Sequence, residues 1–105
     1  MENFEDSKVV EIKDFDNVYK FKITLFNAEE GLNFFLKLIN NGEKLTLDII
    51  KDLLKQAILL NKDNNLNQAF SYDLAKSMFR NPITILNLAK EVKDFQNVFI
   101  QNSNI

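Results

Sequence analysis

Residues 26–40 read FNAEEGLNFFLKLIN, and this stretch predicts an amphipathic helix around which the rest of the fold is arranged. Asn27 is a favoured N-cap residue, and Glu30 three positions later completes an arrangement like a capping box. Gly42, which follows two asparagines, is a residue suited to end the helix. At about 100° per residue, one apolar stripe contains Ala28, Leu32, Phe35, Leu36 and Ile39.

Two further apolar residues of this stretch, Phe34 and Leu38, fall outside that stripe. They widen the apolar arc to about 200°, whereas a helix with one buried face needs about 100°. In one interpretation the helix is sandwiched between a sheet and another helix, and the whole arc is buried. In the other, Phe34 and Leu38 are exposed and contact a partner or a second subunit. The pattern leaves both interpretations open.

The residues before this helix predict a β-hairpin over residues 8–26. In its second run, apolar side chains recur at a period of two: Tyr19, Phe21, Ile23 and Leu25. Between them lie the polar residues Lys20, Lys22 and Thr24. The first run, over residues 9–13, is shorter and more polar and predicts an edge strand. Residues 14–17 are suited to a turn, and residues 1–7 are expected to be loose.

The residues after Gly42 predict further helices. One covers residues 46–61 and begins at the N-cap Thr46, and a polar loop follows over residues 61–67. A short helix is predicted over residues 72–79. A last helix starts at Asn81-Pro82, an N-cap followed by a first-turn proline, and runs to about residue 100. Its apolar stripe contains Ile85, Leu88, Ala89, Val92, Phe95 and Phe99, with Thr84 on the side that faces away.

These patterns predict an α+β fold in which an N-terminal β-hairpin is followed by a small bundle of three to four helices. A chain of 105 residues fits a single domain with one modest core, its helical part covering residues 27–101. The residues expected in the core are Tyr19, Phe21, Ile23, Leu32, Phe35, Leu36, Leu53, Leu54, Leu88, Val92 and Phe95.

The composition argues against catalytic chemistry. The chain has no cysteine and no histidine, which removes thiol nucleophiles, disulfides, the usual zinc ligands and the most common proton carrier near neutral pH. Gly31 and Gly42 are the only glycines, so no glycine-rich phosphate loop exists. Asp14, Asp16 and Asn17 lack the glycine and the distal glutamate of a calcium-binding loop. We therefore expect no enzyme activity, no cofactor and no metal.

The charge pattern argues against nucleic acids and membranes as partners. The formal net charge is −2, the basic residues are scattered, and Arg80 is the single arginine. Nucleic-acid binding requires a basic stripe instead. No apolar run approaches the ~18 residues that span a bilayer, and the N-terminus lacks the basic start and apolar core of a secretory signal. These features predict a cytoplasmic protein.

Two segments carry a family resemblance. Residues 19–40 read YKFKITLFNAEEGLNFFLKLIN, a lysine-decorated strand that leads into a helix beginning Ala-Glu-Glu-Gly-Leu. Residues 69–99 read AFSYDLAKSMFRNPITILNLAKEVKDFQNVF, a short aromatic segment before a long apolar helix. This pattern, over residues 18–99, resembles the tail assembly chaperones of long-tailed bacteriophages and prophages. The middle of the chain departs from that family, because it is short and rich in asparagine where a longer variable segment is expected.

The resemblance implies a non-enzymatic role in virion morphogenesis, in the host cytoplasm. Such chaperones bind the long, apolar, helical tape-measure protein, keep it soluble and help to recruit tail-tube subunits. On this interpretation the wide apolar arcs of the first two helices contact a partner helix or another copy in a homo-oligomer. The residues expected to bind the partner are Phe34, Leu38, Ile49, Leu53 and Leu60.

Two other functions fit the sequence. One is a small phage-encoded inhibitor that blocks a host or defence protein by mimicking a surface such as nucleic acid. Six acidic side chains lie within residues 1–16 rather than on a folded face, which argues against that function. The other is a structural subunit of a larger particle, which predicts stable, stoichiometric assembly. A tail-tube gene upstream and a very long coiled-coil gene downstream would favour the chaperone.

Overall fold

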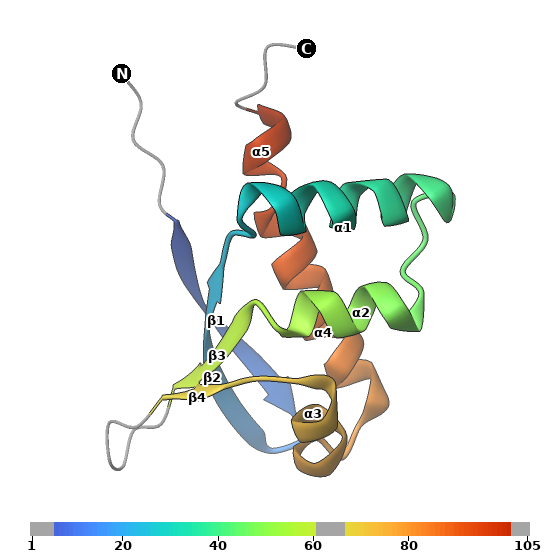
Figure 1. Cartoon of the computed structure of the whole chain (residues 1–105). Helices are drawn as coiled ribbons and strands as arrows, with labels where there is room; N and C mark the ends of the chain where they lie inside the picture. The colour runs from blue at the N-terminus through green and yellow to red at the C-terminus, as the bar shows by residue number, and fades with distance from the viewer. Residues whose placement is uncertain (1–5, 61–66, 102–105) are drawn as a thin grey trace.

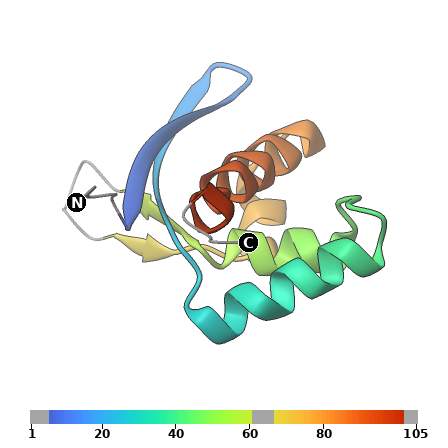
Figure 2. The ribbon, with the colours of Figure 1, turned by 90° about the horizontal axis from the view of Figure 1, so that it is seen from above.

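The computed structural model describes residues 6–60 and 67–101. In chain order the elements are β1 (Ser7–Asp14), β2 (Asn17–Thr24), α1 (Ala28–Asn40), α2 (Leu47–Leu54), β3 (Ala57–Leu60), β4 (Gln68–Ala69), α3 (Tyr72–Met78), α4 (Pro82–Phe95) and α5 (Val98–Gln101). The strands form an antiparallel sheet in the order β1-β2-β3-β4. The helices gather on one side of this sheet (Figure 1, Figure 2). The predicted α+β class is confirmed.

The predicted N-terminal hairpin is confirmed, and a tight turn of Phe15 and Asp16 joins its two strands. Phe15 has a φ of 53°, a left-handed conformation that aromatic residues rarely adopt. The guanidinium of Arg80 lies over the Phe15 ring, 5.3 Å from its centroid. This cation–π contact compensates part of the cost of the turn, because it adds a favourable interaction for the Phe15 ring in that position.

The hairpin starts earlier than the sequence predicted. Residues 1–7 were expected to be loose, but Ser7 belongs to β1. In addition, the carbonyl oxygen of Asp6 accepts a hydrogen bond from the Leu25 N–H at 3.1 Å. These backbone contacts hold Asp6 and Ser7 beside the end of β2. The expectation for residues 1–5 lies outside the described residues.

The helix predicted over residues 46–61 is wrong in its second half. Helix α2 ends at Leu54, and Ala57–Leu60 form strand β3, which pairs with Lys20–Ile23 of β2. The side chains of Ala57, Ile58, Leu59 and Leu60 are compatible with either structure, because a short apolar run does not reveal its period. The free edge of β2 decides the outcome, since pairing satisfies its backbone groups. The helical part of the chain is therefore interrupted by β3 and β4.

The last two helical predictions are confirmed at their starts. Ser71 caps α3, and the Asn81 side chain accepts a hydrogen bond from the Ile83 N–H at 3.0 Å at the start of α4. The end of the last helix was predicted near residue 100, but α4 stops at Phe95 and α5 follows after a turn. Gln96 lies at this turn, as the C-cap of α4, and its buried side chain binds backbone groups of Thr24 and Phe26.

Buried polar side chains hold both ends of α4. At its start, the Asp14 carboxylate accepts hydrogen bonds from the Arg80 N–H at 2.9 Å, the Asn81 N–H at 3.0 Å and the Thr84 hydroxyl at 2.9 Å. The prediction that Thr84 faces away is therefore wrong. Thr84 is buried because its hydroxyl completes the hydrogen bonds of a buried carboxylate on β1.

At the other end of α4, the Gln96 amide is also buried. Its oxygen accepts a hydrogen bond from the Phe26 N–H at 3.1 Å, and its Nε2 donates to the Thr24 carbonyl at 3.0 Å. Thr24 in turn donates its backbone N–H to the Gln56 carbonyl at 2.9 Å. These hydrogen bonds attach the connection between β2 and α1 to the C-terminal ends of α4 and α2. They therefore fix the point from which α1 starts.

The core lies between the helical side of the sheet and helices α2 and α4. Six residues predicted to be in the core are buried: Phe21, Ile23, Leu53, Leu54, Leu88 and Val92. Three more are partly buried against it: Tyr19, Phe35 and Phe95. The predictions for Leu32 and Leu36 are wrong, since these side chains are 61% and 49% exposed. Their exposure follows from the orientation of α1.

Candidate protein-binding surface

Helix α1 has the ends that the sequence predicted. The Asn27 side chain accepts a hydrogen bond from the Glu30 N–H at 2.8 Å. After Asn40 the chain turns through Gly42, whose φ is +64°. The N–H groups of Gly42 and Glu43 donate to the carbonyls of Ile39 at 3.1 Å and Leu38 at 2.7 Å. These bonds satisfy carbonyls that the helix itself leaves unpaired.

The buried face of α1 contains Gly31, Phe34 and Leu38. The Phe34 ring stacks on the Phe26 ring, with centroids 5.2 Å apart. A Cβ atom at Gly31 would lie 3.5 Å from the Phe26 Cβ, an ordinary van der Waals distance, so Gly31 packs beside Phe26 on this buried face. Phe34 and Leu38 are 1% and 7% exposed, and the first of the two interpretations made from the sequence is correct for them.

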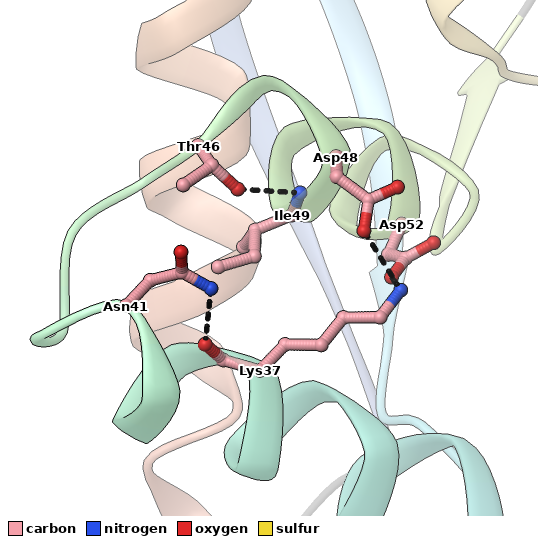
Figure 3. Close-up of polar contacts among 6 residues, drawn as sticks. All are labelled: Lys37, Asn41, Thr46, Asp48, Ile49 and Asp52. Atoms are coloured by element: carbon pink, nitrogen blue, oxygen red, sulfur yellow. Dashed lines mark hydrogen bonds and ion pairs between the residues drawn. The ribbon is translucent and has the colours of Figure 1, made fainter.

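An ion pair on the neighbouring face of α1 favours the same rotation of the helix about its axis, with Phe34 and Leu38 buried. Lys37 Nζ lies 2.7 Å from Asp52 Oδ2 and 3.1 Å from Asp48 Oδ2, both on α2 (Figure 3). The hydrogen bond to Asp52, and after it the one to Asp48, raise the pKa of Lys37 above its ordinary value, although desolvation lowers it. Because Lys37 and Phe34 lie one turn apart, this contact turns Phe34 towards the core.

The opposite side of α1 is therefore apolar and exposed. Leu32, Leu36 and Ile39 lie along it at successive turns and are 61%, 49% and 63% exposed, and we refer to these three residues as the α1 stripe. The sequence had assigned this stripe to the core. The correction has a simple cause: α1 lies at the margin of the molecule, so only the face that meets Phe26 and α2 is covered.

A groove continues the apolar surface from α1 to the C-terminal end of the described chain. It has a volume of about 290 Å³. Its lining contains Phe34, Phe35, Leu38, Ile39, Glu43, Lys93, Asn97 and Ile100. Ile39 thus belongs both to the α1 stripe and to the groove, and Ile100 is 61% exposed. The stripe and the groove form one surface in which apolar side chains are bordered by a few polar ones.

The residues expected to bind a partner are mostly core residues. Phe34, Leu38, Ile49 and Leu53 are buried, and of these four Phe34 and Leu38 contribute to the lining of the groove. Leu60 is half-buried and lies in β3, apart from α1. Burial argues against these four residues as the main contacts of a partner, whereas the assignment of Leu60 stays a prediction. On α1, the angular pattern had treated the minority side of the apolar arc as the excess. In the folded chain that minority side is the one that packs.

One signal in the sequence indicated the true orientation of α1. Around the helix Leu38 lies between Phe34 and Gly31, and a glycine within a helix lowers its stability unless it has a packing role. A packing role for Gly31 favours the burial of Phe34 and Leu38, which share its face.

Within the described residues, no group of three or more acidic side chains is placed to hold a metal ion. Among the described residues, Asp14 is the one acidic side chain that is buried. The Arg80 N–H is the largest cause that lowers the pKa of Asp14 below its ordinary value, and the Asn81 N–H and the Thr84 hydroxyl act in the same direction against burial. All the hydrogen bonds of this carboxylate come from the loop and first turn of α4, so its role is structural.

Comparisons with protein-family models, with curated proteins and with solved structures find no match to this chain. The part of the chain that the structure describes also has no helix with the length and apolarity needed to cross a bilayer.

Proposed function

We propose that the protein is a non-enzymatic assembly chaperone that covers an apolar helix of a partner protein with the α1 stripe and the adjoining groove. The observation that carries this proposal is the exposure of Leu32, Leu36 and Ile39 on one side of a helix whose packed face contains Gly31, Phe34 and Leu38. A stripe of this spacing matches the contact surface of a second helix, as in complexes where an amphipathic helix lies in an apolar groove.

The size of the surface supports a specific interaction. The α1 stripe and Ile100 together expose an apolar area on the order of 400 Å², within the range of the largest patches on monomeric proteins, which often have a function. A standard interface buries about 800 Å² on each partner, of which rather more than half is apolar. The patch therefore supplies about the apolar share of one standard interface.

The partner that we propose is the tape-measure protein of a long-tailed phage or prophage, acting in the host cytoplasm. The resemblance of residues 19–40 and 69–99 to tail assembly chaperones supports this choice. A long helical protein with apolar stripes needs a cover before it assembles, and an exposed row of leucine and isoleucine side chains suits that task. The polar residues at the groove, Glu43 and Lys93, would border the bound helix.

The test is co-purification with the tape-measure protein encoded nearest to this gene. In the test variant Leu32→Ser, Leu36→Ser and Ile39→Ser are combined. Because these side chains are exposed, the variant is expected to fold with a melting temperature close to that of the original protein. It is expected to lose about 2 kcal/mol or more of binding free energy if the stripe is the centre of the interface.

A matched control removes comparably exposed apolar side chains outside the α1 stripe and the groove: Leu47→Ser and Ile83→Ser, at residues that are 52% and 54% exposed. The control variant is expected to retain binding. Unchanged binding by the stripe variant would refute the α1 stripe as the site. No binding by the original protein would refute the tape-measure protein as the partner, and stable incorporation into finished particles would favour a structural subunit.

A further inference from the structure

The face of the sheet that points away from the helices has a composition unlike the rest of the molecule. Residues opposite each other in an antiparallel pair point to the same face. Val10, Ile12, Phe21 and Ile23 are buried on the helical side, so the residues between them point outward. Along β1 and β2 the outward residues are Ser7, Val9, Glu11, Lys13, Val18, Lys20, Lys22 and Thr24. Figure 2 shows the helices on the other side of the sheet.

Three lysines dominate this surface, and we call Lys13, Lys20 and Lys22, with Val9 and Val18, the lysine face. Lys20 and Lys22 are neighbours on the outward side of β2, and Lys13 lies diagonally across from Lys20 on β1. Val9 and Val18 lie among them and are 56% and 57% exposed. The face thus combines positive charge with exposed apolar side chains.

The lysines of this face have little acidic compensation. Glu11 lies opposite Lys20 and is the one acid among the outward residues of the two strands. Lys22 lies between Val9 on β1 and Ile58 on β3, both apolar. In the described part of the chain, all the ion pairs involve Lys37 and Lys76, and none involves a lysine of this face. The protein is acidic overall, so this concentration of unpaired positive charge is a local feature.

We propose that the lysine face binds an extended, acidic segment of a partner protein, at a site separate from the α1 stripe. Charge complementarity identifies the partner: its carboxylates would pair with Lys13, Lys20 and Lys22. Same-face residues of a strand recur about every 7 Å, and the neighbouring lysines of β2 have this spacing. A segment in which acidic and apolar residues alternate would therefore place carboxylates near the lysines and apolar side chains near Val9 and Val18.

The surface fits an acidic protein segment better than a nucleic acid. The outward residues of β1 and β2 include no aromatic side chain on which a base could stack and no arginine to bind phosphate bidentately. The one arginine of the chain, Arg80, lies over the ring of Phe15 at the hairpin turn. The net charge of −2 would also repel a long polyanion such as a nucleic acid. A short acidic segment would experience mainly the positive potential near the three lysines.

The experiment uses the full chain and a short fluorescent peptide in which glutamate and valine alternate, with binding followed by anisotropy. The test variant combines Lys13→Gln, Lys20→Gln and Lys22→Gln. The matched control combines Lys44→Gln, Lys55→Gln and Lys90→Gln, which removes the same charge from exposed sites on the helical side. We expect the test variant to bind about tenfold more weakly, the control to bind as the original does, and added salt to weaken binding.

A peptide with glutamine in place of glutamate is expected not to bind. Equal affinity of the two lysine variants, or no binding by the original protein, would overturn the proposal. Tighter binding to single-stranded DNA or to anionic lipid vesicles than to the peptide would overturn it as well and assign the face to those partners. The stripe variant at Leu32, Leu36 and Ile39 is expected to bind the peptide normally, so this test is independent of the proposed chaperone function.

Discussion

Helices α1 and α4 are nearly equal in length, with 13 and 14 residues, and each has an apolar stripe predicted from the sequence, but only one of the two stripes is buried. On α4 the predicted stripe is the buried one, with Leu88, Ala89 and Val92 at 0% exposure. On α1 the predicted stripe is exposed. An apolar arc shows which residues of a helix are able to pack against the core. The elements that surround the helix decide which of these residues become buried. Helix α4 has neighbours in β1, β2, α2 and α3, and the main neighbour of α1 is α2.

The two helices also differ in how they are anchored. Buried polar groups hold both ends of α4: Asp14 from β1 at its start and the Gln96 side chain at its end. Helix α1 is held by Phe34 and by an ion pair of Lys37 that is partly exposed to solvent. A buried hydrogen bond contributes more than a solvated ion pair, so α4 is expected to be the more firmly held.

The largest expected effect lies on the buried side of α1. Phe34→Ala removes a ring that is 1% exposed, and large-to-small changes of this kind cost about 3–5 kcal/mol of unfolding free energy. Leu36→Ala on the exposed side is expected to cost less than about 1 kcal/mol. Denaturant unfolding followed by circular dichroism measures both. Equal losses of unfolding free energy for the two variants would contradict the orientation of α1, in which Phe34 is buried and Leu36 is exposed.

The next effect concerns the start of α4. Asp14→Asn keeps the shape of the side chain and removes its charge, so the hydrogen bonds from Arg80, Asn81 and Thr84 weaken. The folded-state pKa of Asp14 is lowered, so its contribution to stability is complete above the unfolded value of about 3.9 and is lost as the pH falls through the folded value. The difference in melting temperature between the original protein and the variant is expected to be largest near pH 7 and to shrink in acid. A difference that does not depend on pH would show that charge is not what holds this end.

A third variant tests the other end of α4. Gln96→Ala leaves the Phe26 N–H and the Thr24 carbonyl without their partner, and an unsatisfied buried group costs about 1–3 kcal/mol. Amide hydrogen exchange is expected to increase at Phe26 and at the first turn of α1, since Gln96 positions the chain where it leaves the sheet. Exchange that increases only within α4 would mean that the two helices are held independently.

The smallest effect is expected at the ion pair between α1 and α2. Lys37→Met keeps the apolar stem and removes the charge, with an expected loss of about 0.2–1 kcal/mol, because the ammonium is partly solvated. The pKa of Lys37 is raised, so its contribution is complete below the unfolded value of about 10.4 and is lost as the pH rises through the folded value. High salt should reduce the difference in unfolding free energy between the variant and the original protein. A loss as large as that of Phe34→Ala would show that the ion pair, and not the ring, orients α1.

Local signals predicted the elements that have local causes. The caps at Asn27, Thr46 and Asn81 and the turn after Asp14 involve groups a few residues apart, so the chain near them carries the information. The strand β3 was missed because its cause is distant: residues 57–60 become a strand by pairing with β2, more than thirty positions earlier. The same holds for Thr84, whose burial depends on Asp14.

The candidate binding surface follows the same division. The surplus of apolar surface on α1 could be predicted from residues 26–40 alone, because it depends only on residue types and the helical period. The exposure of Leu32, Leu36 and Ile39 depends instead on contacts that form in the folded chain. The physical reason is that the rotation of a helix about its axis costs nothing within the helix and is set by contacts outside it. Here these contacts are the packing of Gly31 and Phe34 against Phe26 and the pairing of Lys37 with α2.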